Sequence, residues 1–192
     1  VLGFRASLGE LQGHGGKLSN RRINGILQPL RQILAEAADL YSFVSPMANL
    51  KSLKVRKSDV DPFTLDQVQR LLVVARADFR NYFTVRFFTG MRTGEAHGLK
   101  WKYVDFERRL ILVRETFVLG EDEYTKTDYS QRDIQMTQVV FDALKRQYAD
   151  TGRRGEYVFC NRQGKPIDNK NFVTRIWQPL LRHLGMTVRR PY

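Results

Sequence analysis

The stretch over 87–101 constrains the fold most, because it predicts two helices joined by a very short link. An apolar helical run over 79–88 ends at Gly90, and glycine readily adopts the left-handed conformation that closes a helix. Thr93 offers a hydroxyl that can cap the start of the second helix. Arg92 would then be held in the tight link between the two helices.

Arg92 is the first candidate for chemistry. The predicted link places it beside the start of the second helix, where backbone N–H groups without partners favour an anion. A fixed guanidinium there can donate parallel hydrogen bonds to two phosphate oxygens. Glu95 falls in the first turn of the second helix, where a carboxylate is favoured. A simple helix–turn–helix corner, in which Arg92 only pairs with Glu95, would explain the same spacing, so the spacing alone leaves both interpretations open.

The charge of the chain indicates a polyanionic partner. Its 192 residues include 32 Lys and Arg against 20 Asp and Glu, which gives a net charge of +12 at pH 7. We expect this partner to be nucleic acid, and a basic protein without such a partner is the alternative. The single cysteine excludes an internal disulfide, and the three histidines lack the spacing of metal ligands. We therefore expect no metal site. No apolar run approaches the roughly 20 residues of a membrane span and no secretory signal is present, so the cytoplasm is the default location.

The first 60 residues predict a helical segment followed by a linker. Ser19 can cap a helix over 20–42, in which apolar residues recur at threes and fours along one face. Pro29 inside this run predicts a kink. The periodicity then stops, so we interpret 1–45 as one domain part and 46–60 as a basic interdomain linker, whose charges either contact phosphates or are simply solvated. The candidates for phosphate contact are Arg21, Arg22, Lys51, Lys54, Arg56 and Lys57.

A second domain is predicted over 61–192. Its first helix opens with a capping box over 64–67. Apolar and β-branched residues over 110–113 predict a strand. Two further short strands, over 123–127 and 132–136, are expected to pair as a hairpin and complete the sheet. The predicted fold class is therefore mainly α with a small three-stranded antiparallel β-sheet (α+β).

Two motifs together resemble the active-site boxes of the tyrosine recombinases, the phage integrase family. The first is the pattern Thr-Gly-x-Arg-x-x-Glu-x-x-x-Leu-x-Trp, carried here by Thr89, Gly90, Arg92, Glu95, Leu99 and Trp101. The second is the hairpin pattern Thr-Lys-Thr-x-x-Ser-x-Arg, carried here by Thr125, Lys126, Thr127, Ser130 and Arg132. The resemblance covers 61–192 as the first two-thirds of a catalytic domain. Residues 1–45 are similar to the C-terminal part of the family's helical core-binding domain.

The resemblance implies a reaction in which a tyrosine attacks a DNA phosphate and becomes linked to the 3′ phosphate. Such a reaction needs cations at the non-bridging oxygens and an acid for the leaving 5′ oxygen. By resemblance, Arg92 is one of these cations, Lys126 is the general acid, and Glu95 orients Arg92. Ser130 and Arg132 are interpreted as turn and strand-edge residues. Further candidates for phosphate contact are Lys100 and Lys102.

The family's second arginine and its nucleophilic tyrosine are expected beyond Tyr192, so this fragment is expected to bind DNA without cutting it. The resemblance implies a double-stranded DNA partner and a tetramer of the full-length protein on DNA. It also implies a phage or mobile-element gene and action at the bacterial nucleoid. The main alternative is a decayed integrase that binds DNA without strand transfer. A basic RNA-binding protein is a third interpretation, but the aromatic and glycine signatures of common RNA-binding modules are missing from the sequence.

Overall fold

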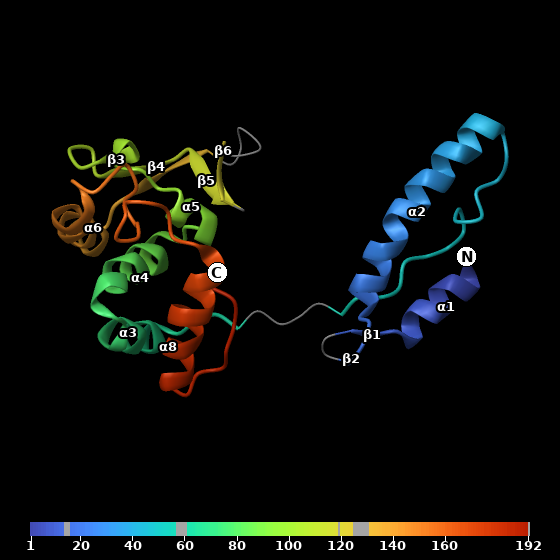
Figure 1. Cartoon of the computed structure of the whole chain (residues 1–192), viewed down its shortest axis with the longest axis horizontal. Helices are drawn as coiled ribbons and strands as arrows, with labels where there is room; N and C mark the ends of the chain where they lie inside the picture. Colours follow the sequence, from blue (N-terminus) through green and yellow to red (C-terminus); the bar gives the residue numbers. More distant parts are fainter. Residues whose placement is uncertain (14–15, 57–60, 119, 125–130, 192) are drawn as a thin grey trace. The chain divides into compact units, whose positions relative to one another are not determined.

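The computed structural model of the chain describes residues 1–13, 16–56, 61–118, 120–124 and 131–191. It divides into two compact units, Val1–Asp61 and Pro62–Tyr192 (Figure 1). Each unit has a hydrophobic core of its own, so its elements pack among themselves.

The first unit is built on one long helix. Ser19 caps α2 (Asn20–Tyr41), because the Arg22 N–H donates to its Oγ at 3.3 Å, as the sequence predicts. Pro29 lies inside this helix. The other elements are α1 (Leu2–Glu10) and a hairpin of β1 (Gln12–Gly13) and β2 (Gly16–Lys17). The buried apolar residues of the unit are Leu8, Ile23, Leu27, Met47 and Leu50.

Residues 46–54, which the sequence analysis assigned to the linker, pack along α2 and belong to the first unit. The Asn24 side-chain amide donates to the Leu53 carbonyl and accepts from the Leu53 N–H, both at 2.9 Å. Arg31 Nη2 donates to the Leu50 carbonyl at 2.7 Å. These bonds satisfy the backbone of the segment and fix its path, which explains why it is not a free connection.

The second unit is mainly helical. The Thr64 hydroxyl accepts from the Gln67 N–H at 3.2 Å while the Gln67 side chain accepts from the Thr64 N–H at 3.0 Å, so the predicted capping box is confirmed. The helices are α3 (Leu65–Val74), α4 (Ala77–Thr89), α5 (Thr93–His97), the 3₁₀ turn Trp101–Tyr103, and α6 (Gln138–Thr151). The last helical stretch runs through α7 (Asn169–Phe172), the π-helical turn Val173–Trp177 and α8 (Gln178–His183).

Two small antiparallel sheets complete the second unit. The first has three strands in the order β3 (Val104–Asp105), β4 (Leu110–Val113) and β7 (Arg132–Gln135). The second pairs β5 (Glu115–Val118) with β6 (Glu121–Tyr124). In Figure 1 these strands lie on the opposite side of α4 from α3. The predicted class, mainly α with a small three-stranded antiparallel sheet, is confirmed.

The predicted pairing of the strands is wrong. The sequence analysis paired 123–127 with 132–136, but β6 pairs with β5, and β7 pairs with β4 instead. Gly120, at φ +95°, takes a conformation that favours glycine, so the chain reverses immediately before β6. Lys126 lies in 125–130, outside the described residues.

An aromatic core surrounds α4. Tyr82 and Phe83 are each 1% exposed and pack edge-on or tilted against Phe172, with ring centroids 5.1 and 6.0 Å apart. Phe83 also contacts Trp177 of the last helical stretch at 5.8 Å. Aromatic contacts on this scale stabilise a core beyond simple burial. They fix the middle of α4 against the last helical stretch, and α4 leads directly into the link that carries Arg92.

Candidate active site

The link between α4 and α5 is as short as the sequence predicts. Gly90 closes α4 with φ +66°, and its N–H donates to the Arg86 carbonyl at 3.0 Å. Met91 is 2% exposed and fastens the link to the core. Arg92 follows as the residue that precedes the first turn of α5.

The predicted cap on α5 is wrong. Arg92, not Thr93, is the N-cap residue, and the Glu95 carboxylate accepts from the Arg92 N–H at 2.8 Å. This carboxylate reaches back to the N-cap as the third residue of a capping box does. The Thr93 hydroxyl is left to donate to the Pro191 carbonyl at 2.8 Å.

Arg92 presents an exposed guanidinium that is held at one end. Its side chain is 75% exposed, and its Nη1 lies 3.2 Å from Glu95 Oε1. No other ion pair of Arg92 occurs within the described part of the chain. A guanidinium in this state can bind an anion on the surface with little loss of side-chain freedom.

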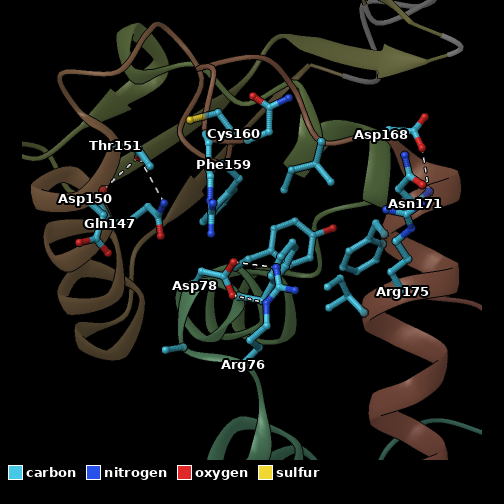
Figure 2. A pocket seen from close by; sticks show the side chains of 18 of the residues that line it. Arg76, Asp78, Gln147, Asp150, Thr151, Phe159, Cys160, Asp168, Asn171 and Arg175 are labelled. Atoms are coloured by element: carbon cyan, nitrogen blue, oxygen red, sulfur yellow. Dashed lines mark hydrogen bonds and ion pairs between the residues drawn. The ribbon is translucent and has the colours of Figure 1, made fainter.

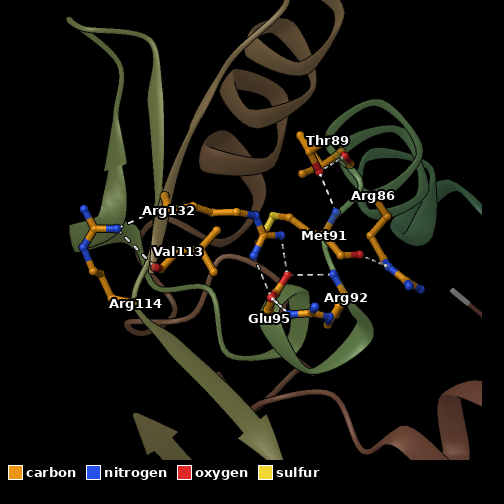
Figure 3. A network of polar contacts seen from close by, with 9 residues as sticks. Arg86, Thr89, Met91, Arg92, Glu95, Val113, Arg114 and Arg132 are labelled. Carbon is orange, nitrogen blue, oxygen red and sulfur yellow. Dashed lines mark hydrogen bonds and ion pairs between the residues drawn. The ribbon is translucent and has the colours of Figure 1, made fainter. Parts of the chain in front are cut away.

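Glu95 is 1% exposed and lies between two arginines (Figure 3). Burial alone would raise the pKa of its carboxyl. Hydrogen bonds from Arg132 and from the Arg92 N–H, together with both positive charges, outweigh burial and hold the pKa below its usual value. Glu95 is therefore ionised at neutral pH and fully occupied as an acceptor, which suits an orienting group and not a base.

Arg132 is the site residue that the sequence analysis missed. Its Nη1 and Nη2 donate to Glu95 Oε1 and Oε2 at 2.9 and 2.8 Å, a bidentate pair. The hydrogen bonds to Glu95 raise the pKa of Arg132 above its ordinary value. Thirty-seven positions separate the two residues, and no sequence periodicity connects them. The one available signal was the arginine in the hairpin motif, which the analysis treated as a strand-edge residue.

The last described residues pass beside the Arg92 corner. The Pro191 carbonyl accepts from Thr93 Oγ1 and, at 3.2 Å, from Arg86 Nη2. The Trp177 indole N–H donates to the Arg189 carbonyl at 2.6 Å. These bonds attach both ends of 189–191 to helices of the core. The chain therefore passes next to the link that carries Arg92.

The two lysines after α5 lie in different environments. Lys100 is 7% exposed, and its Nζ lies 2.8 Å from Glu115 Oε2 and 3.6 Å from a Glu156 oxygen. The Lys102 side chain is 57% exposed and lies 3.3 Å from Glu115 Oε1. Burial would raise the pKa of Glu115, but hydrogen bonds from Lys100, Tyr103 and Lys102 lower it overall. Lys100 thus neutralises a buried carboxylate, and of the two lysines Lys102 is the one with a largely exposed side chain.

The predicted phosphate contacts of the first unit are at its surface. The exposed members of the set are Arg21, Arg22, Lys51, Lys54 and Arg56. Lys57 lies outside the described residues.

No group of three His, Cys, Asp or Glu suited to a metal occurs in the described ranges. No helix within those ranges is long and apolar enough to cross a membrane.

A hollow of about 970 Å³ lies elsewhere in the second unit (Figure 2). Its lining includes the ion pair of Arg76 with Asp78, at 2.6 Å, and the aromatic residues Phe79 and Phe159. The lining includes none of the three residues Arg92, Glu95 and Arg132. The candidate site is therefore an exposed corner and not this hollow, which suits a ligand that lies across the surface.

Residues 62–190 match the phage integrase family. This match covers more than half of the chain, so the chain belongs to that family. The motif residues Arg92, Glu95 and Arg132 all fall inside the matched range.

Among curated proteins, the prophage integrase IntR of Escherichia coli K12 is 25% identical, over 100% of this chain and 55% of its own length. The transposase of transposon Tn916 from Enterococcus faecalis is 31% identical over 54% of this chain and 30% of its own. The chain thus spans about half the length of the first of these relatives. Among solved structures, the Tn1549 transposon integrase with circular intermediate DNA is 19% identical. The match covers 91% of this chain and 62% of the Tn1549 integrase chain with a TM-score of 0.75, so the two proteins share the fold.

Proposed function

We propose that this chain is part of a site-specific DNA recombinase that cuts and rejoins duplex DNA through a covalent 3′-phosphotyrosine. The observation that carries the proposal is Arg92, an exposed guanidinium fixed by a buried carboxylate at the position of the family's first active-site box. Phosphoryl transfer to a protein hydroxyl needs such a fixed cation where charge rearranges in the transition state. Integration or excision of a mobile element is the biological outcome, in line with the prophage and transposon relatives.

Arg92 and Lys126 have different roles in this proposal. Arg92 stabilises charge on the non-bridging oxygens of the scissile phosphate, and Glu95 orients it. Lys126 protonates the leaving 5′ oxygen as the general acid. The second arginine and the nucleophilic tyrosine follow Tyr192 in the full-length protein, so the fragment alone is inactive. The reaction uses no metal or nucleotide cofactor, because arginines and lysine supply the positive charge.

Double-stranded DNA is the proposed partner, held mainly through phosphates by exposed basic side chains. The proposed contacts are Arg21, Arg22, Lys51, Lys54, Arg56, Lys57 and Lys102. We leave Lys100 out of this set because its charge is buried against Glu115. The full-length protein acts as a tetramer on DNA, in the cytoplasm at the nucleoid. One related structure is described as a lambda integrase tetramer bound to a Holliday junction.

A second candidate function is DNA binding without strand transfer. One relative, IntQ of Escherichia coli K12, is described as a defective protein and is 27% identical over 59% of this chain. A decayed integrase would keep the fold and the basic surface while losing cleavage. The two candidates therefore differ in cleavage and not in DNA binding.

Single-turnover cleavage by the full-length protein tests the roles of the two residues. Arg92→Ala should cleave about 10²–10³-fold more slowly, which is the usual cost of losing one fixed electrostatic contact to a transition state. Lys126→Ala should also be slow, but a substrate with a 5′-bridging sulfur should restore much of its rate, because a thiolate leaves without a proton. The same substrate should not rescue Arg92→Ala, whose defect lies at the non-bridging oxygens.

Equal rescue of both variants would show that the roles are misassigned. Undiminished cleavage by Arg92→Ala, or no cleavage by the native protein, would remove the proposed activity.

A further inference from the structure

We propose that Arg132 is a positioning residue that holds the Glu95 carboxylate in the orientation from which it fixes Arg92. The inference rests on the proposed function of Arg92. It gives a role to a strand residue whose guanidinium binds Glu95. The side chains of Arg92, Glu95 and Arg132 lie together in Figure 3.

The hydrogen bonds of Glu95 are shared equally between the two arginines. Oε1 accepts from Arg132 Nη1 at 2.9 Å and from Arg92 Nη1 at 3.2 Å. Oε2 accepts from Arg132 Nη2 at 2.8 Å and from the Arg92 N–H at 2.8 Å. Each oxygen thus has one donor from each arginine, and the carboxylate cannot turn without losing bonds to both. The planar fork of Arg132 sets the plane of the carboxylate, and this plane sets the position of Arg92 Nη1.

Exposure decreases from Arg92 through Arg132 to Glu95. The side chains are 75%, 37% and 1% exposed, respectively. A carboxylate this buried requires a close cation, and the shorter, bidentate bonds come from Arg132. Because Arg132 neutralises the charge of Glu95, the positive charge of Arg92 remains available to bind a phosphate. Without Arg132, Arg92 would be the only cation left at Glu95 within the described contacts, and its guanidinium would be drawn towards the carboxylate.

The backbone of Arg132 is itself held by the sheet. Arg132 is opposite Val113 in the β4–β7 register. Arg114 Nη1 donates to the carbonyls of both residues at 3.1 Å, and Arg114 Nη2 lies 2.5 Å from Asp133 Oδ1. Because the pairing of β7 with β4 fixes this strand, Arg132 projects from it to α5 and couples the sheet to the corner. Arg114→Met removes these side-chain bonds but keeps the β4–β7 pairing and every described donor to Glu95, so it provides a matched control for the loss of an arginine from this sheet.

Single-turnover cleavage by the full-length protein on a nicked duplex tests this coupling. Arg132→Met should slow cleavage by about 10- to 100-fold, because a small displacement of a catalytic group has costs of this order. Its affinity for the same DNA should stay within about twofold, because Arg132 is not proposed to contact phosphate. Arg114→Met, which removes an arginine from the same sheet, should stay within about threefold of the native rate. Arg132→Lys should restore part of the rate, since it keeps the charge but not the fork.

A double-mutant cycle identifies the route through Arg92. If Arg132 acts only by placing Arg92, then Arg92→Ala with Arg132→Met should cleave no more slowly than Arg92→Ala alone. Multiplied rate losses in the double variant would overturn the inference, as would an equal loss in Arg114→Met. Native cleavage by Arg92→Ala would instead refute the proposed function, so the two failures are distinguishable.

One more variant separates positioning from folding. Arg132→Met leaves a buried charge with a weaker partner and is open to misfolding, whereas Glu95→Gln combined with Arg132→Met removes that charge. We expect this double variant to unfold cooperatively near the native temperature and yet to cleave as slowly as Arg132→Met or more slowly. Recovery of the native rate would mean that Arg132 only neutralises Glu95, and the positioning role would be wrong.

Discussion

His97 makes the stability of the second unit depend on pH. It is 1% exposed, and its Nε2 lies 2.9 Å from the Tyr82 hydroxyl. Burial, and then the positive charge of Arg86, lower the pKa of His97 from 6.5 to about 4, and Asp168 opposes this only in part. The folded protein therefore holds a neutral imidazole at a pH where an unfolded chain would protonate it.

The sign and size of the effect follow from proton linkage. Well above pH 6.5 the imidazole is neutral in both states and contributes no pH dependence. As the pH falls from 6.5 towards 4, the unfolded chain binds a proton that the folded chain refuses, so the free energy of unfolding decreases. Between about pH 7.5 and about pH 5 the loss is about 2 kcal/mol, and it approaches about 3 kcal/mol near pH 4. The pKa values of Glu95 and Glu115 are lowered from 4.5, so the stability that these carboxylates contribute to the folded protein is lost only as the pH falls below that value.

Urea unfolding followed by tryptophan fluorescence measures this loss in the second unit alone. Both tryptophans of the chain, Trp101 and Trp177, lie there, so unfolding of the first unit does not contribute. His97→Gln is the matched variant, since the amide still reaches the Tyr82 hydroxyl but does not titrate. Between about pH 7.5 and about pH 5 the native protein should lose about 2 kcal/mol more than the variant. Equal pH dependence in the two proteins would refute the reasoning.

Three further predictions use the same fragment. Thr64→Ala removes the capping box on α3 and should lower the free energy of unfolding by about 1 kcal/mol in the same fluorescence assay. Gly98→Ala should cost about 1–3 kcal/mol, because overpacking forces a backbone shift. The added Cβ would lie 2.7 Å from the Phe117 nitrogen of β5. Duplex DNA binding, measured by fluorescence anisotropy, should weaken with a log–log salt slope of about −4 to −5 if about 5 phosphates are neutralised. An affinity insensitive to salt would contradict phosphate contact.

Helix boundaries could be predicted because they depend on neighbouring residues. The cap at Ser19, the capping box at Thr64 and the left-handed Gly90 each involve groups within a few positions of one another. Strand pairing could not be predicted in the same way. The strand over 132–135 has its partner at 110–113, and an independent hairpin lies between them in sequence. Choosing the nearest strand as partner therefore gave the wrong pairing.

Charge alone did not predict the environment of a lysine. Lys100 and Lys102 are two positions apart and both were interpreted as phosphate contacts. Lys100 is buried against Glu115, whereas Lys102 is largely exposed. The difference depends on β5, which brings Glu115 to them from 13 to 15 positions away. Burial of a charged side chain is set by such a distant partner, and a basic composition does not reveal it.

The sequence left two interpretations of Arg92 open, and the geometry of Glu95 bears directly on them. In a simple helix–turn–helix corner, Arg92 would be the cation that compensates the buried carboxylate. In the structure the bidentate partner of that carboxylate is Arg132, and Arg92 contributes one side-chain bond at 3.2 Å and a backbone N–H. One buried negative charge is thus flanked by two positive charges, and the surplus lies on the exposed member of the pair. A corner built only for stability would need one arginine, so the second favours an anion from outside.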